Sequence, residues 1–264
     1  SAQPPEASVE LASVTERGVS AVIRLPGTVI SRRDSEISAE LSGRLNWVAE
    51  VGDAIEQGEP VAIIDDHLLQ LQLRDNLAEI ARIQADIDYN RRQSQRLERL
   101  AAQNNMAQSE LDQVKSRQAM LLQDRTKAEV TRDRTLYDLE RTRVSAPFSG
   151  IVASRQMNLG EYTSPGAALV RLVDTQALEI SVNAPLRAVH FNTPGSQVQV
   201  EADDRQILSA IRSIIPVGDA RSRMMEMRIN LEPGNWSIGE AVTIDLVDGH
   251  RELSLSVPRD ALVL

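Results

Sequence analysis

The chain has 264 residues, of which 42% are hydrophobic and 25% are charged, the balance of a folded protein with one to three domains. Its net charge of −9 and its aromatic content of 3% argue against nucleic-acid binding, because phosphates repel such a surface and single strands need aromatic stacking platforms. The absence of cysteine excludes thiol nucleophiles, disulfides and thiolate metal sites.

The N-terminal part of the chain is β-prone. Residues 19–30 are mostly apolar and rich in branched side chains, which favours a strand. No apolar run reaches the roughly 18 residues of a membrane-spanning helix, and no secretory signal opens the sequence. The sequence therefore indicates a soluble chain with a flexible polar start at residues 1–5, and residues 19–30 could join the strands of the C-terminal part.

Two copies of one glycine pattern flank the middle of the chain. The interval from the second to the third glycine is six residues in both copies, and the interval from the first to the second is nine or ten. Each copy predicts short strands with turns at the glycines, where positive φ or close backbone approach is tolerated. The structural glycines are Gly43, Gly52 and Gly58 in the first copy and Gly150, Gly160 and Gly166 in the second.

The segment between the copies predicts a long helical hairpin. It contains neither proline nor glycine between Asp65 and Pro147. Steps of four and three residues trace an apolar seam with polar interruptions, the pattern of a coiled coil, and a polar patch at 103–106 suits a turn. Two helices within residues 67–143 would form an antiparallel rod roughly 50 Å long. The expected seam is Leu69, Leu73, Asn76, Ile80, Ile83, Ile87, Asn90, Ser94, Leu97, Ala101, Leu111, Val114, Gln118, Leu121, Arg125, Ala128, Arg132, Thr135 and Leu139.

An ordinary helical bundle is the alternative for this segment. The seam is narrow and the outer faces are highly charged, which favours the hairpin.

After Asp174 the alternation of apolar and polar residues returns. Four segments predict strands with one buried face, and residues 185–191 predict a short helix. The apolar positions are Leu178, Ile180, Val182, Val198, Val200, Met227, Ile229, Leu231, Val242, Ile244 and Leu246.

The two halves of short strands resemble the biotinyl/lipoyl domain, a flattened sandwich of two similar halves. In carrier proteins of that family a tight turn between the halves bears the lysine that takes the cofactor. Here the hairpin replaces that turn, and the only lysines, Lys115 and Lys127, fall within its second helix. A carrier function is therefore disfavoured, and we expect no cofactor.

A lipoyl-like fold split by a coiled coil is similar to the periplasmic adaptor, or membrane fusion protein, family of tripartite efflux pumps, which includes the HlyD-like and AcrA-like proteins. The resemblance covers nearly the whole chain. The matching motifs are residues 51–53 (Val-Gly-Asp) with Gly58, residues 146–152 (Ala-Pro-Phe-Ser-Gly-Ile-Val) with Gly160 and residues 165–166 (Pro-Gly), and the barrel turn at 233–234 (Pro-Gly) and 238–239 (Ile-Gly).

The resemblance implies an elongated multidomain fold of the β plus α class. Its parts are a lipoyl-like β-sandwich split into two segments, an inserted antiparallel α-helical coiled-coil hairpin, a β-barrel domain and a partial membrane-proximal β domain, in which residues 9–14 pair with residues 257–262. The expected boundaries are 1–17 and 251–264 for the membrane-proximal domain, 18–36 and 175–250 for the barrel, 37–66 and 144–174 for the sandwich, and 67–143 for the hairpin.

The resemblance also implies a function. The chain would bridge an inner-membrane transporter of the resistance-nodulation-division type and a TolC-like outer-membrane channel, as a ring of copies, six by the family pattern, in the periplasm of a Gram-negative bacterium. It would be held at the inner membrane through a lipid or helix anchor outside this sequence, and it would catalyse nothing. An adaptor of an ATP-driven or type I secretion transporter shares the architecture and remains an alternative.

The hairpin tip is the candidate partner-binding site. Adaptors of this family present an arginine, a leucine four residues on and a hydroxyl residue seven further, where the channel docks. Arg96 and Leu100 match this spacing, whereas Ala107 departs from it and Ser109 lies nearby. The expected channel-binding residues are Arg96, Leu100, Gln103, Asn104, Asn105, Met106 and Ala107.

The methionine, histidine and acidic residues that could form a metal or catalytic site have structural interpretations instead. Residues 224–227 (Met-Met-Glu-Met) invite a soft-metal site, but their alternation on a strand favours packing. The three histidines are far apart, and the acidic pairs at 65–66 and 203–204 predict solvated turn charge. We therefore predict neither a metal site nor a catalytic site.

Overall fold

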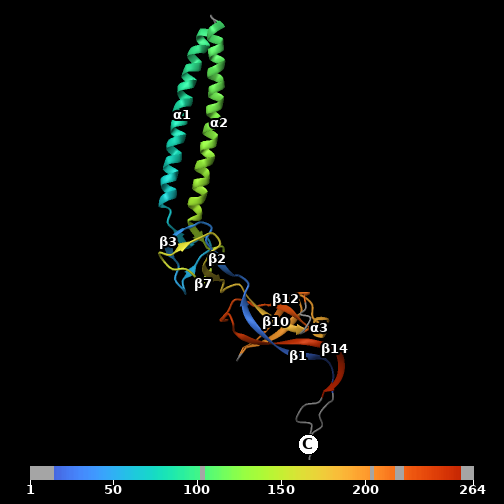
Figure 1. The fold of residues 1–264 in the computed structure, drawn as a ribbon. Coiled ribbons are helices and arrows are strands. Elements are labelled where there is room, and N and C mark those ends of the chain that lie inside the picture. The colour runs from blue at the N-terminus through green and yellow to red at the C-terminus, as the bar shows by residue number, and fades with distance from the viewer. Residues whose placement is uncertain (1–14, 102–104, 203–204, 218–222, 257–264) are drawn as a thin grey trace, which may run out of the picture. The chain divides into compact units, whose positions relative to one another are not determined.

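The computed structural model describes residues 15–101, 105–202, 205–217 and 223–256 (Figure 1). The chain divides into two compact units, one of residues 33–174 and one of residues 1–32 with 175–264. Its elements in chain order are β1 (Thr15–Ser31), β2 (Asp34–Ser38), β3 (Gly43–Val48), β4 (Ala54–Ile55), β5 (Pro60–Ile64), α1 (His67–Ala101), α2 (Asn105–Arg141), β6 (Arg143–Ser145), β7 (Gly150–Arg155), β8 (Tyr162–Thr163), β9 (Ala168–Val173), β10 (Leu178–Pro185), α3 (Leu186–Val189), β11 (Gln197–Ala202), β12 (Arg205–Ile214), β13 (Met224–Asn230) and β14 (Ala241–Ser256).

The sandwich in the first unit is built from both sequence repeats. One sheet has the order β2-β9-β7-β4 and the other β6-β5-β3-β8, so that each sheet combines strands from both copies. The exchange is reciprocal, since the amide of Gly52 donates to the carbonyl of Val152 while that of Gly160 donates to Leu45. The core between the sheets includes Leu45, Val61, Ile64, Val152, Leu169 and Leu172, all at most 1% exposed.

The repeated glycines serve two different backbone requirements. The second and third of each copy have positive φ, for example 96° at Gly52 and 83° at Gly160, where any other residue is strained. The first of each copy marks a close approach, because a Cβ on Gly150 would lie 2.5 Å from the carbonyl oxygen of Val173. The spacing of the pattern therefore reflects turn geometry and packing together.

The sandwich begins a few residues before the expected boundary at residue 37. Strand β2 starts at Asp34, which is opposite Val173 on β9. The guanidinium of Arg171 donates to the Asp34 carboxylate, with Nε 2.7 Å from Oδ1, and this hydrogen bond lowers the pKa of Asp34. The first strand of the sandwich is therefore marked by the ion pair between Asp34 and Arg171, which hydrophobic periodicity in the sequence does not reveal.

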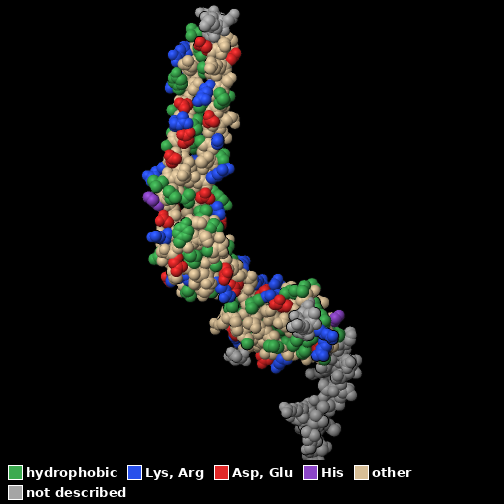
Figure 2. Space-filling view, viewed as in Figure 1, with side chains coloured by type: hydrophobic (Ala, Val, Ile, Leu, Met, Phe, Trp, Pro, Cys, Tyr) green, Lys and Arg blue, Asp and Glu red, His purple; other side chains and the backbone are tan. Residues whose placement is uncertain are grey.

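Helices α1 and α2 lie side by side as an antiparallel hairpin (Figure 1). Every predicted seam position whose side chain is described is buried or half-buried, and the apolar centre consists of Ile83, Ile87 and Leu121 with Ala128 packed against them. Figure 2 shows acidic and basic side chains mixed along the outer faces of the hairpin. The split sandwich and its inserted hairpin confirm the predicted fold class.

The lower part of the seam contains a buried polar pair. Asn76 and Thr135 are each 7% exposed, and the Asn76 amide donates to the Thr135 hydroxyl over 2.8 Å. Gln72 donates to the Asn76 side-chain oxygen, and the Thr135 hydroxyl donates to the carbonyl of Thr131. The pair is therefore satisfied, as a buried polar group in a coiled-coil seam requires.

Removal of one partner of this pair is expected to cost more than removal of both. Asn76→Ala leaves the Thr135 hydroxyl without its buried donor and should lower the free energy of unfolding of the hairpin by about 1–3 kcal/mol. The double variant Asn76→Leu/Thr135→Val should recover most of that loss. Thermal melts followed by circular dichroism test this difference, and a double variant less stable than Asn76→Ala would contradict it.

The second unit contains a closed barrel with the strand order β1-β10-β13-β12-β11-β14. Its core contains the alternating apolar residues of the sequence, with Ile180, Val200, Met227, Ile229, Ile244 and Leu246 fully buried. The short helix α3 falls within the predicted helix at 185–191.

Strands β1 and β14 pair from Thr28↔Ala241 to Thr15↔Ser256, so the ladder continues across both expected limits of the barrel at 17/18 and 250/251. The expected pairing of residues 9–14 with 257–262 lies outside the described residues.

Candidate functional site

The candidate partner-binding site lies at the distal end of the hairpin. Helix α1 ends at Ala101 and α2 begins at Asn105. Of the expected binding residues, Gln103 and Asn104 lie outside the described residues, and Asn105, Met106 and Ala107 belong to the first turn of α2 with side chains that are likewise not described. Arg96 and Leu100 are thus the two expected residues with described side chains.

Arg96 and Leu100 are both exposed near the end of α1. Leu100 is 54% exposed, whereas Leu97 on the seam is 8% exposed. The Arg96 guanidinium donates to the Gln93 side-chain oxygen over 3.3 Å, and within the described part of the chain it has no carboxylate partner. Because residues four apart share one helix face, a cation and an apolar side chain are presented together.

The neighbouring carboxylate of Glu98, by contrast, is paired with a cation within the hairpin. Glu98 pairs with Lys115 across the two helices, with 3.2 Å between the carboxylate oxygen and the Lys115 nitrogen. Leu97 on α1 and Leu111 on α2 are both buried at seam positions near this pair in sequence. The end of the hairpin is thus held together by its own contacts, while the Arg96 guanidinium keeps donors for another molecule.

This arrangement suits protein recognition. A guanidinium offers forked donors to carboxylates or backbone carbonyls, and an adjacent leucine contributes apolar area that a partner helix can cover. The surface therefore has the chemistry of a docking site for another protein.

The other side chains considered in the sequence analysis have the following surroundings. No group of three or more histidine, aspartate or glutamate side chains within them is arranged to hold a metal ion. Met227 is fully buried in the barrel core. Asp65 accepts the backbone amide of His67 over 2.9 Å at the start of α1. Lys115 and Lys127 lie on α2, and no described helix is long and apolar enough to cross a membrane.

Sequence reasoning missed two features that depend on the barrel topology. One is a buried carboxylate, Glu179, that contacts three arginines. The other is a groove beside Trp236. Both combine residues from strands far apart in the sequence, and no local pattern marks them.

Comparison with known proteins finds relatives named as multidrug resistance proteins. No family model matches it. The chain is 27% identical over 219 residues to multidrug resistance protein MdtA of Yersinia pestis (strain Pestoides F), a match that covers 81% of this chain and 47% of that protein. It is 28% identical over 184 residues to MdtA of Yersinia enterocolitica serotype O:8, covering 67% of this chain and 40% of that protein. The chain thus spans about half the length of the curated relatives it matches.

Solved structures share the fold. MacA from Actinobacillus actinomycetemcomitans superimposes with a TM-score of 0.77 at 19% identity, covering 92% of this chain and 84% of MacA. The membrane fusion protein Spr0693 from Streptococcus pneumoniae R6 superimposes with a TM-score of 0.69 at 15% identity, covering 85% of this chain and 98% of that structure. The sequence matches and the shared fold together confirm the resemblance of this chain to the periplasmic adaptor, or membrane fusion protein, family.

Proposed function

We propose that this chain is the periplasmic adaptor of a tripartite efflux pump, where it bridges an inner-membrane transporter of the resistance-nodulation-division type and a TolC-like outer-membrane channel. The observation that carries the proposal is the replacement of the tight turn of a lipoyl-like sandwich by a hairpin of two helices of 35 and 37 residues. Similarity to multidrug resistance proteins supports export of drugs or other small molecules as the process.

In this proposal the protein acts by holding the transporter and the channel in position. The hairpins of several copies, six in our proposal, pack side by side in a ring in the periplasm, and their tips engage the channel. The barrel and a membrane-proximal domain hold the transporter. We assign residues 1–17 and 251–264 to that domain, into which the ladder between β1 and β14 continues from the barrel. The protein catalyses nothing and needs no cofactor in this scheme.

Copurification tests the proposal. The full-length protein, extracted from its own membranes, should bring down a transporter of the proposed type, and deletion of the adaptor gene should abolish efflux of a fluorescent dye. Recovery of an ATP-driven transporter instead would replace the proposed class with the type I alternative. A biotin or lipoyl adduct in the mass spectrum of the native protein would refute the adaptor function.

Charge reversal at Arg96 is expected to reduce export without unfolding the protein. Arg96→Asp removes the forked donors from an exposed helix position, so folding should change by less than about 1 kcal/mol while efflux falls several-fold. Complementation of an adaptor deletion measures the effect. Arg74→Asp, at an exposed position near the other end of α1, is the matched control and should export normally. Normal efflux by Arg96→Asp at normal expression would remove Arg96 from the docking site.

A hydroxyl at position 107 is expected to be tolerated. The family pattern places serine or threonine where this chain has Ala107. Ala107→Ser should therefore leave cysteine cross-linking between the tip and the channel unchanged or stronger. A marked loss of cross-linking would show that the tip geometry of the family does not apply to this chain.

A further inference from the structure

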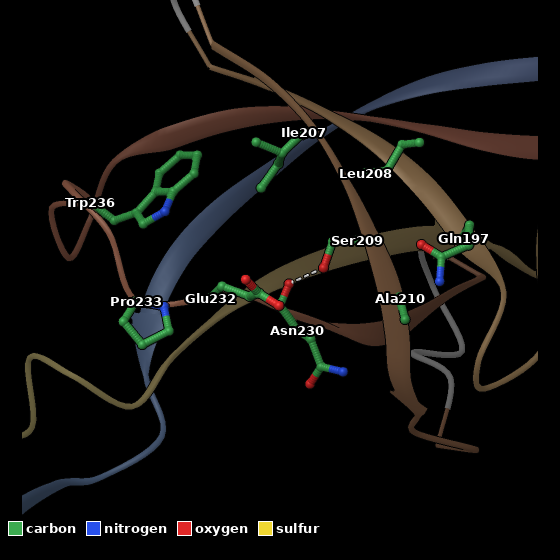
Figure 3. Close-up of a pocket in the computed structure, with 9 residues that line it drawn as sticks. All are labelled: Gln197, Ile207, Leu208, Ser209, Ala210, Asn230, Glu232, Pro233 and Trp236. Atoms are coloured by element: carbon green, nitrogen blue, oxygen red, sulfur yellow. Dashed lines mark hydrogen bonds between the residues drawn. The ribbon is translucent and has the colours of Figure 1, made fainter.

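Strand β12 has an open edge over its first half. Residues 205–210 pair with β11, whereas the described pairing with β13 begins only at Ile211↔Ile229. Strand β13 ends at Asn230, and the segment that follows it leads to Trp236. A cavity of about 480 Å³ is lined by this segment and by the open edge (Figure 3). The cavity thus lies where the ladder between β12 and β13 stops.

The backbone of β12 directs hydrogen-bonding groups toward the cavity. The amide of Ile211 donates to the carbonyl of Ser196, and its own carbonyl accepts from Gly195, so Ile211 faces the β11 side. Backbone groups alternate between the two edges of a strand. Gln206 and Leu208 therefore turn their N–H and C=O groups to the opposite edge, where none of the described strands pairs with them. An open edge of this kind is a template for another strand.

The walls of the groove are fixed by their own contacts. The Arg205 guanidinium stacks over the ring of Trp236 at 4.1 Å and is bonded to the carbonyl of Asn235 and to the carboxylate of Glu240. The hydroxyl of Ser209 donates to the carbonyl of Asn230, where the ladder ends (Figure 3). The groove is therefore preformed, which reduces the entropy that a ligand must lose on binding.

The side chains at the groove define the chemistry of its occupant. Leu208 is 75% exposed beside the open edge. Glu232 is the one charged residue that lines the cavity, and it forms no ion pair within the described part of the chain. A basic side chain complements it. Pairing of two β12 edges would instead bring two Glu232 carboxylates to one interface, which disfavours a second copy as occupant.

We infer that the open edge of β12 binds an extended segment of a partner polypeptide, which adds as a short strand antiparallel to β12 and places a basic side chain at Glu232. The segment continues the ladder that β13 leaves at Asn230. A segment of five residues, roughly 17 Å of strand, covers most of the six-residue open stretch at 205–210. Backbone hydrogen bonds provide affinity, and the apolar contact with Leu208 and the charge of Glu232 provide selectivity. This site is separate from the hairpin tip, and its test does not depend on the tip.

A synthetic peptide tests the inference on the intact chain. The probe is acetyl-Val-Lys-Val-Thr-Val-amide, and its control has the same sequence with N-methyl groups on alternate residues, which prevents pairing along one edge. Titration of the isotope-labelled protein followed by nuclear magnetic resonance should shift the amides of Gln206, Leu208 and Ala210. The methylated peptide should bind at least about tenfold more weakly, because it loses the backbone ladder.

Variants of the protein distinguish the contribution of the backbone edge to peptide binding from that of the apolar side chains beside it. Leu208→Pro removes an amide that faces the groove and should abolish binding of the probe. Leu208→Ala keeps the backbone and should weaken binding severalfold, whereas Val217→Ala, at a side chain that is also 75% exposed, should have no effect. Glu232→Gln should weaken binding of the lysine peptide at low salt and leave a peptide with threonine at that position unaffected.

Three results would overturn the inference. The absence of shifts at millimolar peptide would show that the edge does not take a strand. Equal binding of the methylated peptide would show an apolar patch without strand addition. A dimer of the free chain in sedimentation that disappears in Leu208→Ala would identify a second copy as the occupant.

Discussion

Glu179→Ala is expected to lower the free energy of unfolding of the barrel by about 1–3 kcal/mol. The Glu179 side chain is 5% exposed and lies 2.8 Å from a nitrogen of Arg212, 3.1 Å from one of Arg228 and 3.4 Å from one of Arg32. Removal of the carboxylate leaves three guanidinium groups close together without their shared counter-charge. Repulsion and lost hydrogen bonds then add to the cost, whereas Glu179→Gln keeps an acceptor and should lose less.

The two tryptophans allow this effect to be measured in the barrel alone. Trp236 packs against the barrel core and Trp47 belongs to the sandwich, so urea unfolding of Trp47→Phe followed by fluorescence reports on the barrel. Arg24→Ala is the control within the same unit, because it breaks a surface pair with Asp245 and should cost less than about 1 kcal/mol. Equal effects of Arg24→Ala and Glu179→Ala would contradict the structural role assigned to Glu179.

The cluster around Glu179 illustrates what sequence patterns leave out. Arg212 and Arg228 lie 33 and 49 residues from Glu179 in sequence, and the closed order of six strands brings them together. Period-two alternation identifies the buried face of each strand but carries no information on which strand is its neighbour. The open edge of β12 escaped prediction for the same reason, because it exists only where β13 departs.

The sandwich and hairpin were accessible from sequence because their constraints are local. The turns at Gly52 and Gly160 need positive φ, and their repetition at one spacing reveals two equivalent halves. The seam follows from helical periodicity, including Asn76, whose partner Thr135 also lies on the predicted seam. The candidate docking residues were predicted from family resemblance, since an exposed arginine near a leucine is common on helices. Geometry adds that Arg96 has no described carboxylate partner.

Ile83→Asp is expected to unfold much of the hairpin. Ile83 is 3% exposed and forms the apolar centre of the seam with Ile87, Leu121 and Ala128. A carboxylate there loses apolar burial and must be either desolvated or exposed by separation of the helices, a cost above about 4 kcal/mol. Packing between the helices provides most of their stability. Because polar residues interrupt the seam elsewhere, little other buried apolar surface remains to compensate for the loss at Ile83.

Circular dichroism of the full chain and of residues 67–143 alone measures the loss. The unsubstituted fragment should be substantially helical at high concentration, and Ile83→Asp should lower its melting temperature sharply while the barrel fluorescence of the full chain stays unchanged. Tyr89→Asp, at a side chain on the same helix that is 59% exposed, is the matched control and should melt near the unsubstituted temperature. If both variants melt alike, burial along the seam does not hold the hairpin together, and a random-coil fragment would show that the hairpin depends on the sandwich for its structure.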